Sequence, residues 1–286
     1  MVGQPHKSID RRLLLASLGA AGIAAFCTAP GPAQAAGQIT MVSSAANESA
    51  LDVADARWTE LLRAYTRAGQ DGIVRVDYSA FKASGRAELE RYLASLQAID
   101  AATLPRDGQI AYWINLYNAK TIDIVLAHYP VGSIRDIDLG GSVLSAFTGG
   151  PWAAKVLRVS GQDLSLDDIE HQILRPTAKD PRIHYALNCA SIGCPSLGRS
   201  AYTATALDNA LDAAARAFVN HPRGATIRGG RLTLSSIYDW FAEDFGGADA
   251  GVLRHLKAYA EPGLNGLLAN VTTIAGYGYD WSLNDV

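Results

Sequence analysis

The residues best suited to nucleophilic chemistry are a cysteine and a histidine near the middle of the sequence. Cys189 could serve as a nucleophile and His171 as its base. A thiolate nucleophile needs a base within hydrogen-bond reach, and that base needs an orienting group. The candidates for this third group, or for an oxyanion donor, are Glu170, Asn115 and Asn118. These residue types predict a thiol-dependent hydrolase or transferase that acts on an amide or related acyl bond.

The same cysteine has a second interpretation, in which it forms a disulfide with Cys194. Four residues, Gly193 among them, separate the two cysteines, so the geometry of a disulfide is within easy reach. This alternative describes a non-catalytic binding or scaffold domain whose disulfide rigidifies a recognition loop. Either way, we expect the ligand to be a small molecule or a peptide. Both interpretations remain open at the level of sequence.

The segment before Cys189 alternates like a β-strand over residues 182–189. In a regular strand His184 and Cys189 would point to opposite faces and lie roughly 16 Å apart. We therefore expect His171 to be the better partner for the thiol. His184 would share a face with Asn188, either directed into a pocket or forming a polar patch beneath a loop.

Other arrangements of these residues are less favoured. A zinc site would have to combine His171, His184, Cys189 and Cys194, and their spacing matches no standard ligand pattern. No glycine-rich loop of the nucleotide-binding type is present, and we expect no metal and no cofactor. Glu170 and the asparagines have a structural alternative, because buried carboxylates and amides need polar partners wherever they lie.

The N-terminal 35 residues have the pattern of an export signal. Lys7, Arg11 and Arg12 precede an apolar run from Leu13 to Phe26, and Ala33-Gln34-Ala35 supplies a small-x-small cleavage pattern. The paired arginines indicate a twin-arginine-type signal. About fourteen apolar residues are too few to span a bilayer, which takes about twenty, so we expect no stable membrane anchor after cleavage. The sequence thus predicts a periplasmic or secreted protein that loses Cys27 with its signal.

The charge of the expected mature chain limits its partners. Removing residues 1–35 leaves 22 basic and 27 acidic residues, with no block of like charges. Nucleic acid and anionic lipid are therefore not expected as partners.

The elements that must position these residues follow from hydrophobic periodicity and from turn residues. The pattern predicts a flexible lead-in over 36–50 and a single domain over 51–286. The expected helices lie at 54–68, 89–96, 106–128, 165–175, 204–219 and 236–245, and the expected extended segments at 74–78, 182–189, 226–234 and 272–284. Helix 106–128 is apolar around most of its circumference, which indicates burial. Irregular alternation of helices and strands favours an α+β fold, with several helices packed on a small, largely antiparallel sheet.

Four separated motifs carry a resemblance to a known family. They are YWINLYNA at 112–119, IEHQILR at 169–175, HYALNCAS at 184–191 and YDWSLN at 279–284. In this order they resemble bacterial exported members of the domain of unknown function 547 family, from about Trp58 onward. The family label carries no established reaction. If the resemblance holds, we expect plant members of the family to keep a cysteine that matches Cys189 and a histidine that matches His171. We expect these members to differ from this sequence more often at the positions of His184 and Cys194.

Overall fold

The computed structural model describes residues 32–140 and 150–286. The chain divides into two units, residues 1–39 and 40–286, and the description that follows concerns the second unit. The charged and apolar parts of the expected export signal, from Lys7 to Phe26, lie outside the described residues.

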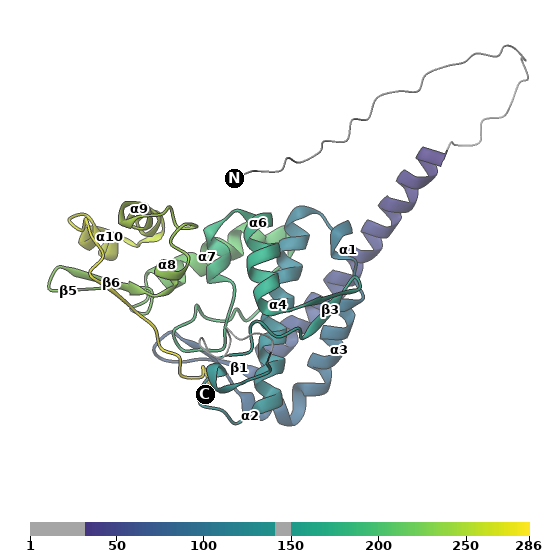
Figure 1. Ribbon diagram of the computed structural model, residues 1–286, viewed down its shortest axis with the longest axis horizontal. Coiled ribbons are helices and arrows are strands. Elements are labelled where there is room, and N and C mark those ends of the chain that lie inside the picture. Colours follow the sequence, from purple (N-terminus) through teal and green to yellow (C-terminus); the bar gives the residue numbers. More distant parts are fainter. Residues whose placement is uncertain (1–31, 141–149) are drawn as a thin grey trace, which may run out of the picture. The chain divides into compact units, whose positions relative to one another are not determined.

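Most of the described chain is helical (Figure 1). The α-helices and the π and 3₁₀ segments between them are α1 (Pro32–Tyr65), α2 (Tyr78–Ala80), η1 (Phe81–Gly85), α3 (Arg86–Gln97), η2 (Ala101–Thr103), α4 (Arg106–His128), η3 (Ile134–Asp136), η4 (Asp168–Leu174), α6 (Arg175–Ala178), η5 (Pro181–Tyr185), η6 (Ala204–Ala206), α7 (Leu207–Val219), α8 (Ile237–Trp240), α9 (Asp249–Tyr259) and α10 (Pro262–Leu268).

The strands are short and form three small sheets within the described residues. They are β1 (Thr66–Ala68), β2 (Val74–Val76), β3 (Leu157–Val159), β4 (Gln162–Leu164), β5 (Ala225–Arg228), β6 (Arg231–Ser235) and β7 (Gly276–Gly278). Strands β1 and β2 pair antiparallel, as do β3 and β4, whereas β6 pairs antiparallel with β5 and parallel with β7. The predicted hairpin at 226–234 is confirmed, and Gly229 and Gly230 provide the positive φ angles that its turn requires. The predicted α+β class, with its largely antiparallel strand pairing, is likewise confirmed.

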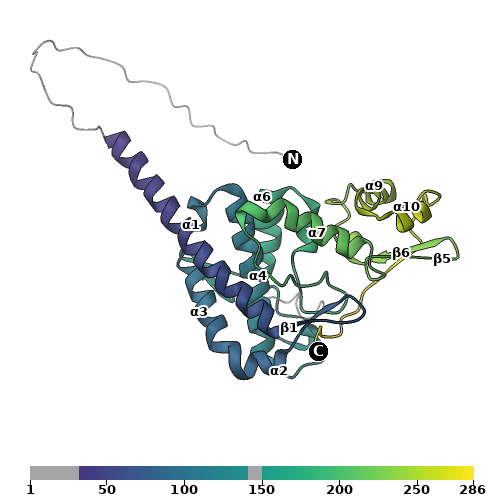
Figure 2. The same ribbon diagram turned by 180° about the vertical axis from the view of Figure 1, so that it is seen from behind.

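Helix α4 is the central element of one hydrophobic core. It begins directly after Pro105 and ends before Pro130, as predicted, and 16 of its 23 residues are buried. It packs against α3, and the aromatic rings of Trp58 from α1 and Tyr92 from α3 stack with centroids 5.2 Å apart. A second core lies among α7, α9, α10 and the β5–β6 hairpin. Both ribbon views show α9, α10 and this hairpin gathered on the side of the unit away from α3 (Figures 1 and 2).

The strand predicted over 182–189 is wrong. Residues 181–185 form the 3₁₀ helix η5, and the chain then turns. Asp180 caps this helix by accepting a hydrogen bond from the Arg182 amide at 2.9 Å, and Pro181 occupies its first turn. Residues 183–188 are all buried, so the apparent alternation did not mark an exposed face. The distance between His184 and Cys189 that was inferred from a regular strand therefore loses its basis.

Three other expected boundaries differ from the structure. Residues 36–50 lie within α1, whose sequence there is rich in alanine, and Asn47 donates a hydrogen bond to Thr103 Oγ1 at 2.8 Å. The helix that starts at the predicted capping box of Ser165 and Asp168 runs past Pro176 to Ala178, because it adopts π-helical geometry over 168–174. The helix expected over 236–245 is only α8, followed by a series of turns.

Candidate functional site

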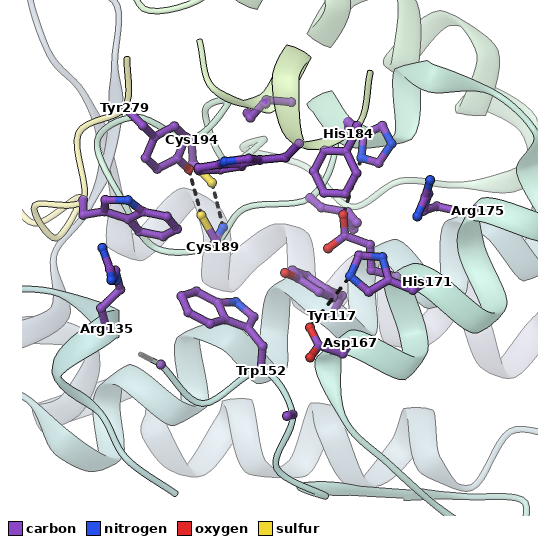
Figure 3. A pocket seen from close by; sticks show the side chains of 18 residues that line it. Tyr117, Arg135, Trp152, Asp167, His171, Arg175, His184, Cys189, Cys194 and Tyr279 are labelled. Carbon is purple, nitrogen blue, oxygen red and sulfur yellow. Dashed lines mark hydrogen bonds and ion pairs between the residues drawn. The ribbon is translucent and has the colours of Figure 1, made fainter. Parts of the chain in front are cut away.

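A pocket of about 710 Å³ brings together residues from distant parts of the sequence (Figure 3). Four of the predicted site residues line it, namely Glu170, His171, His184 and Cys189, and Cys194 lines it too. Aromatic side chains make up much of the remaining wall, contributed by Tyr117, Trp152, Trp240, Phe241, Tyr279 and Trp281. Asn115, Asn118 and Asn188 do not line the pocket.

The two thiols lie side by side at one end of the pocket, and neither forms a disulfide. The backbone N–H of Cys189 donates to Cys194 Sγ at 2.9 Å. Cys189 Sγ lies 3.0 Å from the hydroxyl oxygen of Tyr279 and 3.3 Å from that of Ser191. The Ser191 hydroxyl in turn donates to the Tyr279 oxygen at 3.0 Å. Each sulfur is therefore within reach of polar hydrogens, although the region is largely closed to solvent.

These hydrogen bonds divide the acidity of the pair unequally. Burial alone would raise the pKa of Cys194, but hydrogen bonds from Cys189 and Tyr279 lower that pKa to about 7. The hydrogen bond to Cys194, together with burial, raises the pKa of Cys189 well above its usual value. The two thiols therefore titrate as a coupled pair, in which the hydrogen bonds favour a negative charge on Cys194 over one on Cys189. We had predicted Cys189 as the thiolate nucleophile, whereas these hydrogen bonds favour the thiolate on its neighbour.

Two asparagines position the loop that carries the cysteines. Asn118, on α4, donates to the carbonyl of Ala186 at 2.9 Å and accepts from the amide of Asn188 at 2.8 Å. The Asn188 side chain donates to Pro195 O at 2.8 Å and accepts from the Ala190 amide at 2.9 Å. These amides hold the backbone on both sides of Cys189. They therefore act behind the pocket wall, whereas we had predicted that they would bind the ligand.

The C-terminal segment holds the same loop from the opposite side. The amides of Ile192 and Gly193 donate to the carbonyls of Ser282 and Asp280, each at 2.8 Å. A Cβ atom on Gly193 would lie 2.7 Å from the backbone nitrogen of Asp280, so only glycine allows this approach. The contact places Tyr279 beside the thiols.

Asn115 was predicted as a catalytic residue, but it lies in a different polar cluster. Its amide nitrogen donates to Asp55 at 3.0 Å and to the carbonyl of Tyr202 at 2.8 Å, and its oxygen accepts from the Tyr202 amide. Asn115 lies three residues before Asn118 on α4, and its side chain points toward α1 and the segment before η6. The expectation that both buried amides find partners is confirmed, and the catalytic assignment of Asn115 is not supported.

His184 is held between two carboxylates. Its Nε2 lies 2.8 Å from Asp244 Oδ2, and its Nδ1 lies 3.4 Å from Glu170 Oε1. Arg175 donates to both oxygens of Asp244, at 2.7 and 3.0 Å. Burial by itself lowers the pKa of His184, but the interactions with Asp244 and Glu170 outweigh it and raise the pKa above its usual value. The ring of Phe241 stacks on the imidazole with centroids 3.9 Å apart. His184 is thereby held in an ion-pair network with Asp244, Glu170 and Arg175.

His171 lines the pocket at the end opposite the thiols (Figure 3). Its Nε2 lies 3.9 Å from Asp167 Oδ1. Burial raises the pKa of Asp167, and the nearby imidazole partly counteracts that rise. Tyr117 lies between His171 and Cys189 in the view of Figure 3. The predicted base and nucleophile therefore share one pocket, and among the described residues no hydrogen bond joins them.

Sequence reasoning missed several residues of the site. Tyr279 belongs to a motif that we had used only for the family resemblance and for the expected extended segment 272–284, and Asp167 and Asp244 were not among the predicted site residues. The available signal was the aromatic density of 277–281 together with Trp240. The indole of Trp281 lies within 5.7 Å, centroid to centroid, of the rings of Trp152, Trp240 and Tyr279.

Within residues 32–140 and 150–286, no group of three or more His, Cys, Asp and Glu side chains has an arrangement that could hold a metal ion. No helix in the same ranges combines the length and the apolar character needed to cross a membrane.

Comparison with known proteins gives one match. Residues 101–219 match the family described as "Protein of unknown function, DUF547". This segment includes α4, the π-helical segment with Glu170 and His171, and the loop with both cysteines. It excludes Tyr279 and the pocket tryptophans at 240 and 281. No curated protein and no solved structure matches the chain. The match supports the family resemblance over this segment and brings no reaction with it.

Proposed function

We propose that the pocket binds a small molecule or peptide and performs thiol-dependent cleavage or transfer at an amide or related acyl bond. The observation that carries the proposal is the pair of thiols at the pocket wall, of which Cys194 has a pKa lowered to about 7. A thiol with a pKa near ambient pH is both populated as thiolate and basic enough to accept a proton.

In this proposal the two sulfurs have different roles: Cys189 is the nucleophile, and Cys194 accepts and returns the proton. Cys189 is the more exposed of the pair, and hydrogen bonding couples its titration to that of Cys194. As Cys189 Sγ attacks the acyl carbon, its proton passes to the Cys194 thiolate, and a carbon–sulfur bond forms. When the tetrahedral adduct collapses, the bond to the leaving group breaks, and Cys194 returns the proton to that group. The product of this half-reaction is a thioester on Cys189, with Cys194 again anionic.

Two further groups support this chemistry. The Tyr279 hydroxyl lies 3.0 Å from Cys189 Sγ and can donate a hydrogen bond to the reacting sulfur. The thiols themselves are largely closed to solvent, and charge–dipole interactions become stronger where water is excluded. Asn118 and Asn188 act as positioning residues, because they fix the backbone that carries both thiols.

A non-catalytic role is the competing hypothesis, and the closeness of the two sulfurs favours it. In this role a Cys189–Cys194 disulfide would rigidify a recognition loop. However, the loop is already fixed without a disulfide by the hydrogen bonds of Asn118 and of the segment 280–284. A disulfide would add little rigidity to a loop that hydrogen bonds already fix from both sides.

The test is acylation of the reduced protein by p-nitrophenyl acetate, followed by intact-mass and peptide mass spectrometry. In a Cys27→Ser variant, Cys189 and Cys194 are the only thiols that can be acylated. We expect a stoichiometric burst of p-nitrophenol and one acetyl group on Cys189. Cys189→Ala should abolish the burst with little change in melting temperature, and Cys194→Ala should slow it. A thiol pair that stays oxidised and unreactive after mild reduction, or equal acylation of the Cys189→Ala variant, would overturn the proposal in favour of the structural role.

We propose further that this chemistry takes place outside the cytoplasm. The support is the pattern of Lys7, Arg11, Arg12 and the apolar run that follows them. Replacing both arginines by lysine should retain the precursor in the cytoplasm, as judged by cell fractionation. An unchanged distribution would remove this part of the proposal.

A further inference from the structure

Two arginines line the pocket, and they differ in what their guanidinium groups contact. Arg175 donates to both oxygens of Asp244, at 2.7 and 3.0 Å. The side chain of Arg135 forms no hydrogen bond and no ion pair with any residue of 32–140 and 150–286, where its backbone amide donates to Ser133 Oγ at 3.2 Å. Residues 141–149, which follow in the chain, contain no Asp or Glu. The positive charge of Arg135 is therefore available to a ligand.

The position of Arg135 is fixed through the backbone around it. The Ser133 hydroxyl donates to the carbonyl of Trp281 at 2.7 Å, and the amide of Leu283 donates to the carbonyl of Gly132 at 2.8 Å. These bonds join the start of η3 to the C-terminal segment and place the guanidinium carbon of Arg135 5.2 Å from the centroid of the Trp281 indole. A guanidinium attracted to an indole face is partly ordered in advance, which reduces the entropic cost of binding.

Three tryptophans provide an apolar surface beside this guanidinium. Trp152, Trp240 and Trp281 all line the pocket, and the Trp281 ring lies 5.7 Å from that of Trp152 and 5.6 Å from that of Trp240, centroid to centroid. The Trp240 side chain is 47% exposed, although it is a large apolar group. Exposed aromatic groups gathered at a pocket are typical of a surface that a ligand covers.

Gly150 allows Trp152 to lie at this wall. Its φ angle is +99°, and a Cβ atom there would lie 1.9 Å from the indole of Trp152. In the view of Figure 3, Arg135 lies on the side of the pocket where Cys189 and Tyr279 lie, away from His171 and Arg175. The cation thus belongs to the thiol side of the pocket.

The chemistry of the ligand follows from this cation and from the indole rings. A guanidinium fork matches the paired oxygens of a carboxylate or a phosphate. One available guanidinium balances one negative charge, and a second would meet the carboxylates of Asp167 and Glu170, which line the same pocket. These charges favour a carboxylate over a phosphate dianion. The indole rings favour a flat or aliphatic apolar group attached to that carboxylate.

We infer that the pocket binds a monocarboxylate whose charge pairs with Arg135 and whose apolar body lies on the indoles of Trp152, Trp240 and Trp281. This inference names the substrate class for the proposed function, and it rests on that function only in treating the ligand as a substrate. Arg135 is then the residue that selects the charge of the ligand, whereas the tryptophans bind its apolar part irrespective of charge.

The experiment compares three probes that share a phenyl ring and three carbon atoms. These are 3-phenylpropanoate, 3-phenylpropanamide and 3-phenylpropylamine, which end in an anion, a neutral amide and a cation. Dissociation constants come from the change in tryptophan fluorescence of the reduced protein at pH 7 and low salt. We expect the carboxylate to bind at least about tenfold more tightly than the amide, as for one charge-assisted hydrogen-bonded pair, and the ammonium to bind most weakly.

Two substitutions separate the charge from the apolar surface. Arg135→Gln should weaken binding of the carboxylate about tenfold and leave binding of the amide unchanged. The matched control is Arg254→Gln, at an exposed position of α9 that does not line the pocket, which should change neither. Trp240→Leu should weaken both probes by a similar factor of about two to ten, because its ring does not read the charge. Circular dichroism verifies that the variants fold.

The outcomes separate this inference from the proposed function, because binding is measured without acyl transfer. Equal affinity for carboxylate and amide, tighter binding of the ammonium, or unchanged carboxylate binding by Arg135→Gln would overturn the inference. A stoichiometric acylation burst alongside any of these results would leave the thiol chemistry standing. Tighter binding of 3-phenylpropyl phosphate than of the carboxylate would also overturn the inference. Carboxylate-selective binding that depends on Arg135, in a protein that p-nitrophenyl acetate does not acylate, would support the ligand class and overturn the reaction.

Discussion

The hydroxyl oxygen of Tyr279 lies 3.0 Å from the sulfur of Cys189, although the two residues are 90 positions apart in the chain. The contact exists because backbone hydrogen bonds join residues 280–284 to the loop 190–193. The properties of the thiols therefore depend on the docking of a segment that local sequence around them does not reveal.

Tyr279→Phe tests this dependence. The variant keeps the ring that packs against Trp240 and Trp281 but removes a hydrogen bond that lowers the pKa of Cys194. We expect the midpoint of iodoacetamide alkylation, near pH 7 in the parent protein, to rise, and the alkylation rate at pH 7 to fall several-fold to tenfold, as for a loss of about 1 kcal/mol of thiolate stabilisation. The measurement is a pH–rate profile by mass spectrometry. A midpoint that does not move would show that the hydroxyl does not stabilise the thiolate.

Gly193→Ala tests the close approach of the two backbones. The added Cβ would lie 2.7 and 2.9 Å from the backbone nitrogen and oxygen of Asp280, which cannot swing away as a side chain could. We expect the variant to lose about 1–3 kcal/mol of unfolding free energy, as for other overpacked sites. Gly263→Ala in α10 is the control, because nothing lies within 4 Å of its Cβ, and there a helical alanine should be neutral or stabilising. Urea denaturation measures both, and equal stability of the two variants would contradict the contact.

Asp55 predicts an unusual dependence of stability on pH. Burial raises its pKa from 3.8 to about 7, although the hydrogen bond from Asn115 works against that rise. The folded state thus binds this proton more tightly than the unfolded state. The contribution to stability is complete below about pH 4 and is lost as pH rises through 7. Asp55→Asn should remove this part of the slope, whereas Glu60→Gln, at an exposed position of α1, should preserve it. Urea midpoints between pH 4 and 8 provide the measurement, and parallel curves for the parent and Asp55→Asn would refute the assignment.

Asp244→Asn tests the network around His184. Hydrogen bonds from His184 and Arg175 hold the pKa of Asp244 well below its usual range. Loss of the carboxylate leaves the buried imidazole with Glu170 alone, so we expect a loss of about 1–3 kcal/mol of unfolding free energy and a lower pKa of His184. NMR titration of the imidazole measures the pKa. An unchanged His184 titration would show that Glu170 alone is enough to raise the pKa of His184.

The sequence predicted best the elements whose signals are local. Helix α4 lies within the predicted bounds because prolines flank it and its apolar residues surround it, and the β5–β6 turn is marked by two adjacent glycines. The segment 182–189 was misassigned because it is buried on every side, a situation in which alternation carries no information. Its true start is marked by Asp180 and Pro181, a helix-start signal that the strand pattern obscured.

Part of the membership of the candidate site could be predicted from the sequence, but not the contacts between its residues. Cys189, His171, His184 and Glu170 do meet in one pocket. Their partners, Tyr279, Asp244 and Asp167, could not be assigned, because the contacts depend on how the C-terminal segment and the turns after α8 pack against the central helices. Asn115 and Asn118 have the same residue type and neighbouring positions on α4, so sequence alone could not separate the one near the cysteine loop from the one in the Asp55 cluster.

The pairing of the cysteine loop with residues 280–284 also has a consequence for biogenesis. A ribosome completes both cysteines about 90 residues before it adds Tyr279. During that interval the thiols lack their hydroxyl donor and the backbone that covers them, so a nascent or partly folded chain exposes them to electrophiles and to mispairing. Docking of the C-terminal segment is thus a maturation step, after which Cys194 acquires its lowered pKa and both thiols acquire the protection of the finished protein.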